Sequence, residues 1–381
     1  MPTCPATLTG VRVLICPDKF AGTLTAPAAA AAIAAGWHDT APADQCVERP
    51  LADGGPGFVD VLAQALGGRR VPVSIVDPLG RPVAGEVLLV GTIAYVESAQ
   101  ACGLHLLAAD ERNPRIATSY GLGLLLAGAV EAGAVEVVVG LGGSAVNDAG
   151  AGMLAALGAG PVDAAGYALP YGGAVLGAAA GLSGLPQLRQ VRLVAATDVD
   201  NPLTGLYGAS NVYGPQKGAT RADVLLLDAA LEHFSGVLEK AFDLAPGLAS
   251  LPGGGAAGGL GAALLALGGR VVSGIGLVTT AIGLDAELDA ADLVITGEGS
   301  FDHQSLRGKV AAGVANGARD RGLPCVVLAG RVETGHREAA AAGVSETYSL
   351  VDHFGSVELA LAEPGRGLRE IAAHAARQWS R

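Results

Sequence analysis

The chain of 381 residues is poor in lysine and in aromatic side chains. Lysine accounts for only four of the 24 cationic residues, and aromatic residues make up 4% of the chain. With 36 acidic residues the formal net charge is −12, and the sequence has no basic stripe. This balance argues against nucleic acid or an anionic membrane as the partner. An anionic metabolite would need local cations to offset the repulsive overall charge.

Cysteine and long apolar runs are also scarce. The five cysteines are odd in number, scattered and without C-x-x-C spacing, a pattern typical of a reduced cytosolic protein without a zinc site. The seven histidines show no metal-ligand spacing. The sequence shows no secretory signal, and no apolar run reaches roughly 18 residues. We therefore expect a soluble, cytoplasmic protein without a membrane partner.

Glycine and small apolar residues are abundant: the chain has 58 glycines, and half of its residues are hydrophobic. The length predicts about two or three domains. Short apolar runs that end in Gly or Asp alternate with Ala-rich helical segments, as in parallel sheets covered on both faces. The predicted strands of this kind are 11–16, 135–139, 193–196, 293–295 and 325–328. The predicted helices are 26–36, 57–66, 120–132, 149–156, 222–242, 258–267, 310–320 and 367–378.

Residues 71–99 depart from this rhythm. Three β-rich runs are separated by turn sequences, which predicts an antiparallel meander and a second domain with a mixed sheet. If the chain later returns to the first domain, segments 293–298, 325–330 and 347–351 join 11–16 and 46–49 in one five-stranded sheet. We therefore favour a discontinuous first domain, 1–70 plus 286–381, interrupted by an inserted α/β domain, 71–285. A layout of consecutive domains is the alternative.

Three of the four lysines lie in Gly- and Asp-rich loops: Lys19, Lys217 and Lys309. Because arginine is the prevailing cation of this chain, a lysine in such a loop indicates that a compact ammonium is needed, as in phosphate binding. Chance placement is the alternative interpretation.

Residues 140–152 read G-L-G-G-S-A-V-N-D-A-G-A-G and lie between a predicted strand and a helix. Backbone N–H groups at Gly142 and Gly143, with the positive end of the helix dipole, predict an anion-binding turn. Ser144, Asn147 and Asp148 could then orient a hydroxyl group or a metal ion. Close packing explains such a turn equally well. The segment matches neither a P-loop nor a dinucleotide fingerprint.

A second glycine-rich segment, 253–261, has six glycines in nine residues before an Ala/Leu-rich helix. The backbone at Gly255, Gly258 and Gly259 could press against a flat or phosphorylated ligand. A flexible linker is the rival reading, which the helix that follows disfavours.

Acidic side chains follow several predicted strands. Asp198 comes directly after one, where ligands and Mg²⁺ sit in open α/β sheets, so it is a candidate general base or metal ligand. The alternative is that Asp198 only forms a turn. After another strand, Glu298 and Asp302 are candidate Mg²⁺ ligands, while Arg307 and Lys309 could neutralise a polyphosphate.

These loops together resemble the bacterial glycerate kinase family, the type without a P-loop, over nearly the whole chain. The motifs that carry the resemblance, in order, are P-D-K-F-A-G-T-L-T-A (17–26), A-D-G-G (52–55), G-L-G-G-S-A-V-N-D (140–148), T-D-V-D-N-P-L-T-G (197–205), G-P-Q-K-G-A (214–219), G-G-G-A-A-G-G-L-G (253–261) and A-D-L-V-I-T-G-E-G (291–299) through G-K (308–309). The resemblance implies a flavodoxin-like domain, a second α/β domain inserted into it, and a cleft between the two.

The resemblance also implies ATP-dependent, Mg²⁺-assisted phosphorylation of glycerate, usually at the 2-hydroxyl. On this basis the expected catalytic residues are Asp198, Lys217 and Asp302, and the expected metal ligands are Asp198, Glu298 and Asp302. Nucleotide binding is expected from Gly142, Gly143, Ser144, Asn147, Gly255, Gly258, Gly259 and Lys309. Hydroxy acid binding is expected from Asp18, Lys19, Asp53, Asn201, Gln216 and Gln304. A homodimer is compatible with the sequence.

Four positions depart from the family pattern. Ala21 stands where the family has Lys, Pro56 and Phe58 replace Glu and Thr, and Leu124 replaces Glu. Several polar positions have thus become apolar, mostly where the resemblance places the acceptor. Two alternatives to a glycerate kinase follow: a kinase of a different, larger or less polar hydroxy acid, or a catalytically inactive homologue that binds nucleotide.

Overall fold

The computed structural model describes residues 10–20, 22–188, 191–303, 305 and 310–380. Two compact units emerge from the contacts within the chain. Unit 1 comprises the chain up to Ala52, Asp60–Ala65 and the chain from Val278, whereas unit 2 comprises Asp53–Val59 and Leu66–Leu277. The domain boundaries predicted above, 1–70 plus 286–381 and 71–285, stay a prediction. No helix within the described residues is long and apolar enough to cross a membrane.

Unit 1 is built on a five-stranded parallel sheet with the order β15-β13-β11-β1-β2. Its strands are β1 (Arg12–Pro17), β2 (Gln45–Glu48), β11 (Leu293–Gly297), β13 (Cys325–Ala329) and β15 (Glu346–Ser349). Counted along the unit, the order is 2-1-3-4-5, which is the flavodoxin-like arrangement. The prediction that these five segments form one sheet is confirmed.

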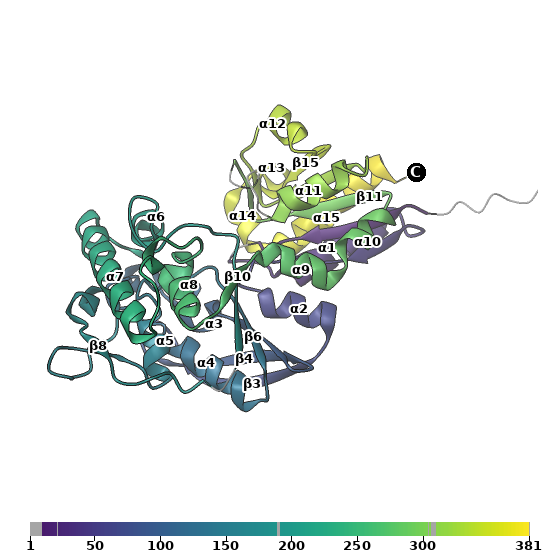
Figure 1. The fold of residues 1–381 in the computed structure, drawn as a ribbon. Coiled ribbons are helices and arrows are strands. Elements are labelled where there is room, and N and C mark those ends of the chain that lie inside the picture. The colour runs from purple at the N-terminus through teal and green to yellow at the C-terminus, as the bar shows by residue number, and fades with distance from the viewer. Residues whose placement is uncertain (1–9, 21, 189–190, 304, 306–309, 381) are drawn as a thin grey trace, which may run out of the picture. The chain divides into compact units, whose positions relative to one another are not determined.

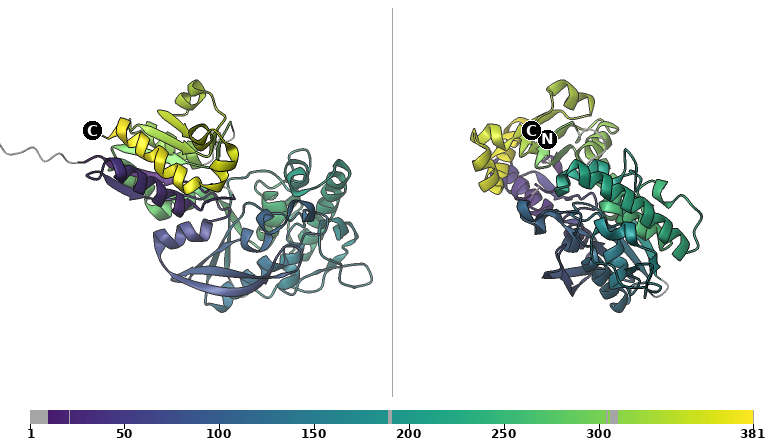
Figure 2. Two further views of the ribbon diagram at one scale, coloured as in Figure 1. Left: turned by 180° about the vertical axis from the view of Figure 1, so that it is seen from behind. Right: turned by 90° about the vertical axis from the view of Figure 1, so that its left-hand side faces the viewer.

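Helices cover both faces of this sheet (Figures 1 and 2). Helices α1 (Ala26–Thr40) and α15 (Pro364–Trp379) pack against each other on one face, and α11 (Val310–Arg319) covers the other. Gly36 allows the close approach of α1 to α15, since a Cβ there would lie 2.0 Å from the carbonyl oxygen of Arg369. Thr25 caps α1, accepting a hydrogen bond from the Ala28 N–H at 3.3 Å.

Shorter elements complete unit 1. They are α10 (Leu284–Asp289), α12 (His336–Ala341), α13 (Leu350–Phe354), α14 (Val357–Ala362), β12 (Ser300–Phe301) and β14 (Arg331–Val332). The chain passes between the units after Ala52, within α2 (Phe58–Leu66) and within α9 (Gly274–Ile282).

Unit 2 contains a six-stranded mixed sheet with the order β10-β9-β6-β5-β4-β3. Its strands are β3 (Arg69–Val76), β4 (Pro82–Val90), β5 (Ile93–Glu97), β6 (Glu136–Gly140), β9 (Arg192–Ala196) and β10 (Arg270–Val272). Strands β3, β4 and β5 form the antiparallel meander predicted for 71–99. Strands β5, β6, β9 and β10 are parallel, so their carboxyl ends lie at one edge of the sheet.

The helices of unit 2 bury the sheet in an Ala- and Leu-rich core. Helix α4 (Tyr120–Glu131) packs on β3, β4 and β5, while α8 (Ala256–Ala266) packs on β9 and β10. Helix α7 (Arg221–Ala241) packs against α6 (Ala209–Tyr213) and α8, and begins with a capping box between Thr220 and Asp223. The remaining elements include α3 (Ala99–Cys102), α5 (Ala151–Ala156), α6 (Ala209–Tyr213), β7 (Pro161–Val162) and β8 (Gly181–Leu182).

Candidate functional site

Three loops meet at the carboxyl edge of the parallel strands in unit 2. They are residues 53–57, residues 140–148 after β6, and the segment after β9 that begins at Thr197. A Cβ on Gly54 would lie 2.7 Å from the carbonyl oxygen of Ala196, and one on Gly142 would lie 2.7 Å from the Cα of Gly55. Glycine is therefore required for the backbones to come this close. The carboxyl edge of an open α/β sheet is where ligands bind.

Lys217 lies in the interior of this region, with 2% of its surface exposed. Its ammonium donates hydrogen bonds to Ser144 Oγ at 3.1 Å and to the carbonyl oxygen of Val146 at 2.7 Å. Burial lowers the pKa of Lys217 to about 8, although the nearby carboxylate of Asp148 acts in the opposite direction. The structure thus brings together the predicted residues Ser144 and Lys217. The Lys217 ammonium loses its proton at a lower pH than that of an ordinary lysine.

Asp148 is fully buried, and both of its carboxylate oxygens accept hydrogen bonds. Its carboxylate accepts hydrogen bonds from the backbone N–H and the hydroxyl of Ser119, both at 2.9 Å, and from the N–H groups of Gly150 at 3.2 Å and Gly152 at 3.1 Å. Burial raises the pKa of Asp148 despite these donors. These contacts join the turn before α5 to the start of α4, so the structure gives Asp148 a positioning role.

Asn147 is fully buried beside Lys217's acceptor Val146. Its amide nitrogen donates to Ser210 Oγ at 2.9 Å. Its Oδ1 accepts no hydrogen bond from any residue that the structure describes. A buried acceptor without a donor is uncommon in native proteins.

The glycine-rich segment 253–261 packs against its neighbours rather than forming an open linker. Gly258 has φ +71°, and a Cβ there would lie 1.9 Å from the carbonyl oxygen of Val146. A Cβ on Gly255 would lie 2.2 Å from the carbonyl oxygen of Pro202, and one on Gly259 would lie 2.7 Å from the Cα of Ala149. The Gly258 carbonyl also accepts a hydrogen bond from the Ala149 N–H at 3.0 Å. Because these glycines have no side chain, the 253–261 segment can pack directly against the 140–148 loop and its neighbours.

Asp198 is exposed and follows β9 at the same edge. Its Oδ1 accepts a hydrogen bond from Ser273 Oγ at 2.6 Å, and its Oδ2 accepts one from the Ile275 N–H at 2.9 Å. A Cβ on Gly274 would lie 3.3 Å from Asp198 Oδ2 and 2.4 Å from the carbonyl oxygen of Asp53. Asp198 and the backbone of Asp53 therefore both lie next to Gly274, in the first turn of α9.

Two other predicted substrate residues of unit 2 differ in their surroundings. Asn201 donates from Nδ2 to the carbonyl oxygen of Tyr207 at 2.8 Å and accepts at Oδ1 from the Tyr213 hydroxyl at 2.7 Å, so it holds its own loop. Gln216 is exposed directly before Lys217.

In unit 1 the remaining predicted residues lie at the carboxyl ends of the paired strands β1 and β11. Asp18 and Lys19 follow β1, and the Asp18 N–H donates to the carbonyl oxygen of Gly297 at 2.8 Å. Glu298 and Asp302 follow β11, and Asp302 Oδ1 accepts from the Ser305 N–H at 3.2 Å. The strand order reverses between β1 and β11, and the carboxyl end of the strands at such a switch point is the usual position of a ligand.

Ala21, Gln304, Arg307 and Lys309 lie outside the described residues.

The carboxylates at the strand ends are the candidate ligands for Mg²⁺. Within the described residues no group of three or more His, Cys, Asp or Glu side chains could hold a metal ion. Mg²⁺ is, however, usually bound by one or two carboxylates together with phosphates of the substrate and water. Glu298 and Asp302 in unit 1, and Asp198 in unit 2, supply oxygen ligands of this kind. The carboxylates at the strand ends of each unit, taken separately, therefore match the donor set of a substrate-bound Mg²⁺.

The apolar departures at 56, 58 and 124 are packing residues. Phe58 is fully buried, with its ring 6.4 Å from that of Tyr95, and its Cδ1 would contact a Cβ on Gly140 at 2.8 Å. Pro56 contacts Gly143 in the same way, at 2.9 Å. Leu124 is partly buried against the core of unit 2.

Sequence reasoning missed the residues that support these loops. Ser273 holds Asp198 and also caps α9, accepting from the Gly276 N–H at 2.9 Å. Ser119 holds Asp148 with its backbone N–H and its hydroxyl, but its side chain makes no capping hydrogen bond to α4. A serine directly before a helix is a capping signal that could have located the start of α9, although not the distant carboxylate that either serine binds.

Comparison with known proteins agrees with this arrangement. Residues 13–380 match the model of the glycerate kinase family. Glycerate kinase of Halalkalibacterium halodurans is 41% identical over 95% of this chain and 96% of its own length. Glycerate 2-kinase of Escherichia coli K12 is 40% identical over 91% of this chain and 92% of its own.

A crystal structure of a "putative glycerate kinase 2" from Salmonella typhimurium LT2 has the same fold, with a TM-score of 0.78 and 39% identity, covering 97% of this chain and 98% of that one. Two α/β units with glycine-lined turns and carboxylates at the strand ends, together with these relatives, define a small-molecule kinase. The chain belongs to the glycerate kinase family.

Proposed function

We propose that the enzyme phosphorylates the hydroxyl of glycerate at the expense of ATP and forms 2-phosphoglycerate. The observation that carries this proposal is the buried Lys217, hydrogen-bonded to Ser144 Oγ and to Val146 in the glycine-lined turn after β6. A cation fixed in a turn of backbone N–H groups suits a phosphate under transfer. The names of the relatives support the substrate and, for the Escherichia coli relative, the 2-position.

In this proposal the nucleotide phosphates lie against the backbone of Gly142, Gly143 and Ser144. Lys309, which lies outside the described residues, is proposed from its sequence motif alone as a further phosphate-binding cation. Asn147, Gly255, Gly258 and Gly259 belong to the same binding region. Because the last three pack against the neighbouring loops, their contribution is to fix the turn that receives the phosphates.

Phosphoryl transfer requires little covalent chemistry from the protein, so positioning and charge neutralisation supply most of the catalysis. Asp198, oriented by Ser273 and the Ile275 N–H, accepts the proton of the attacking hydroxyl. Lys217 offsets the charge that develops on the transferred group. Glu298 and Asp302, or Asp198, would hold Mg²⁺, which when bound neutralises phosphate charge.

Recognition of the hydroxy acid is assigned to Asp18, Lys19, Asp53, Asn201, Gln216 and Gln304. A second candidate function is phosphorylation of a larger or less polar hydroxy acid. It is favoured by Pro56, which places apolar atoms against Gly143 where the family has a glutamate.

The test is an ATP-consumption assay over a panel of hydroxy acids that includes both enantiomers of glycerate, lactate and longer 2-hydroxy acids, with the product identified by ³¹P NMR. Selective turnover of glycerate with a phosphate at C2 supports the proposal. Selective turnover of another acid supports the second candidate. ATP binding without turnover of any acid would refute both and leave an inactive nucleotide-binding homologue.

A further inference from the structure

Arg112 lies in the 98–119 segment of unit 2, and no counterion for it is found in the part of the chain that the structure describes. It is partly buried, and its Nε is buried and meets no hydrogen-bond acceptor. Among the residues that the structure describes, no hydrogen bond or ion pair involves its guanidinium. This is unusual in a chain with 36 acidic residues and a net charge of −12. Three residues along the chain, Arg115 pairs with Asp223 at 3.4 Å.

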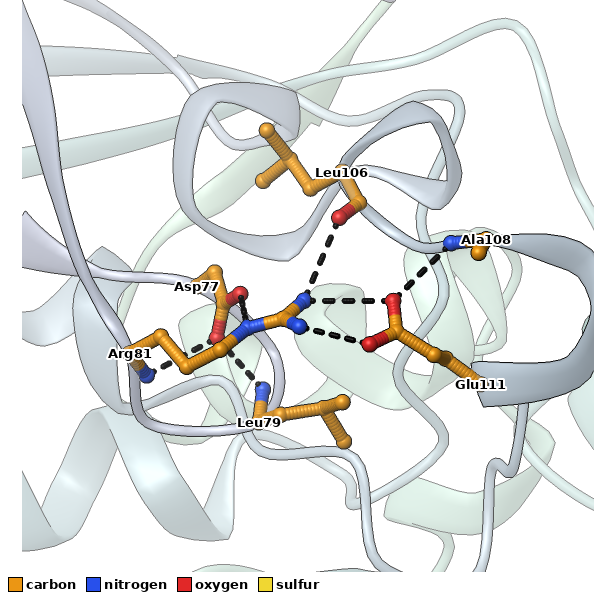
Figure 3. Close-up of polar contacts among 6 residues, drawn as sticks. All are labelled: Asp77, Leu79, Arg81, Leu106, Ala108 and Glu111. Carbon is orange, nitrogen blue, oxygen red and sulfur yellow. Dashed lines mark hydrogen bonds and ion pairs between the residues drawn. The ribbon is translucent and has the colours of Figure 1, made fainter.

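The acid next to Arg112 is already engaged, as Figure 3 shows. Glu111 accepts from Arg81 Nη1 at 2.6 Å and from the Ala108 N–H at 3.0 Å. Arg81 also binds Asp77 and donates to the carbonyl oxygen of Leu106. This network fixes residues 106–111, so the backbone that leads into Arg112 is held while its guanidinium stays without a partner.

Arg112 lies beside the Lys217 turn. A Cβ on Gly218 would lie 2.3 Å from the carbonyl oxygen of Arg112 and 3.3 Å from its Cβ. The start of the same segment runs along the 140–148 loop, since the Leu104 N–H donates to the carbonyl oxygen of Gly143 at 2.8 Å. The segment therefore passes from the predicted phosphate turn to the turn that carries Lys217.

We infer that Arg112 binds an oxyanion of the substrate, either the carboxylate of the hydroxy acid or a phosphate of the nucleotide. Nε–H and one Nη–H of a guanidinium form a fork that matches two oxygens of either group. The Nε of Arg112 is the arm of this fork that the protein leaves without an acceptor. An arginine that served only the fold would be expected to bind nearby carbonyl or carboxylate oxygens. The inference rests on the proposed function.

The test compares Arg112→Gln and Arg112→Lys with the matched control Arg115→Gln, using the KM for glycerate and the KM for ATP measured separately. For Arg112→Gln we expect one of the two KM values to rise roughly 10- to 100-fold, the loss typical of a charged hydrogen bond. Arg112→Lys should recover only part of this loss, because an ammonium cannot form the fork. Arg115→Gln should leave both constants unchanged.

A rise in the KM for glycerate identifies the carboxylate as the ligand, and a rise in the KM for ATP identifies a phosphate. If folded Arg112→Gln keeps both constants within about twofold of the wild-type values, the inference is wrong; if that variant does not fold, the same criterion applies to Arg112→Lys. Should the wild type turn over no hydroxy acid, the proposed function fails on its own. Calorimetric binding of ATP, glycerate and inorganic phosphate then decides, since binding that survives Arg112→Gln, or no binding to the wild type, refutes the inference.

Discussion

The burial of Lys217 predicts a proton-transfer equilibrium within the range in which kinases are assayed. Burial lowers the pKa of this ammonium from its ordinary value of 10.5 to about 8, which corresponds to about 3 kcal/mol of unfavourable charge burial. If the charged form is needed for phosphoryl transfer, kcat should fall as the pH rises through about 8. The charge-free variant of similar shape, Lys217→Met, should lose roughly two or more orders of magnitude in kcat at pH 7.

The scarcity of lysine makes this pKa directly measurable. With four lysines in the chain, ¹³Cε-labelled lysine gives a spectrum of four side chains, and the Lys217→Met spectrum assigns the signal that disappears. We expect this signal to titrate near pH 8. A Lys217 signal that titrates near pH 10, or a Lys217→Met variant with normal kcat, would refute the reasoning.

The same shift predicts how stability depends on pH. Below pH 8 the lysine is protonated in both the folded and unfolded states, and the cost of burying the charge is fully present. Between pH 8 and 10.5 the unfolded state binds more protons than the folded state, so the free energy of unfolding rises with pH. Relative to Lys217→Met, the wild type should gain about 2 kcal/mol between pH 7.5 and 9.5 in urea unfolding. A difference that does not change with pH contradicts this.

Three further predictions test other parts of the site. Asp198→Asn should lower kcat by roughly 100-fold or more, whereas Asp200→Asn, an exposed carboxylate on the same turn, should not; equal effects in a steady-state assay would remove Asp198 as the base. Gly258→Ala should lower the free energy of unfolding by at least about 2 kcal/mol, because its φ is +71° and a carbonyl oxygen would lie 1.9 Å from the new Cβ. The control Gly236→Ala, in the exposed part of α7, should raise the free energy of unfolding by about 0.5 kcal/mol. Thermal denaturation of both variants tests this difference. Removal of Mg²⁺ with EDTA should abolish turnover, and Glu298→Gln should raise the Mg²⁺ concentration needed for half-maximal turnover about tenfold; full activity in EDTA would exclude a metal role.

The strands could be predicted because their local pattern and their burial agree. The runs 325–328 and 293–295 are continuously apolar, and both lie in the fully buried centre of the unit 1 sheet. The meander of 71–99 was also recognisable, since turn residues separate its β-rich runs. In both cases the information lies within a few neighbouring residues.

Helix α9 was not predicted, for the opposite reason. Gly274–Ile282 contains glycine and β-branched residues, which disfavour a helix locally. Its start is fixed by Asp198, 77 residues earlier in the chain, which accepts the Ile275 N–H. The same contact orients the proposed catalytic base, so the helix and the site depend on one long-range interaction that no local pattern contains.

The glycine-rich segment 253–261 shows why a glycine pattern alone does not distinguish contact with a ligand from packing within the protein. In the sequence, Gly258 and Gly259 suggested direct contact with a phosphate, but in the structure they touch the backbone of Val146 and Ala149. The Val146 carbonyl is also the acceptor for Lys217. A side chain at 258 would therefore displace the residue that positions the ammonium. Gly258→Ala should thus raise the pKa of Lys217 toward the value of an exposed lysine in the lysine NMR titration. An unchanged pKa in that variant would show that the packing of Gly258 does not determine the pKa of Lys217.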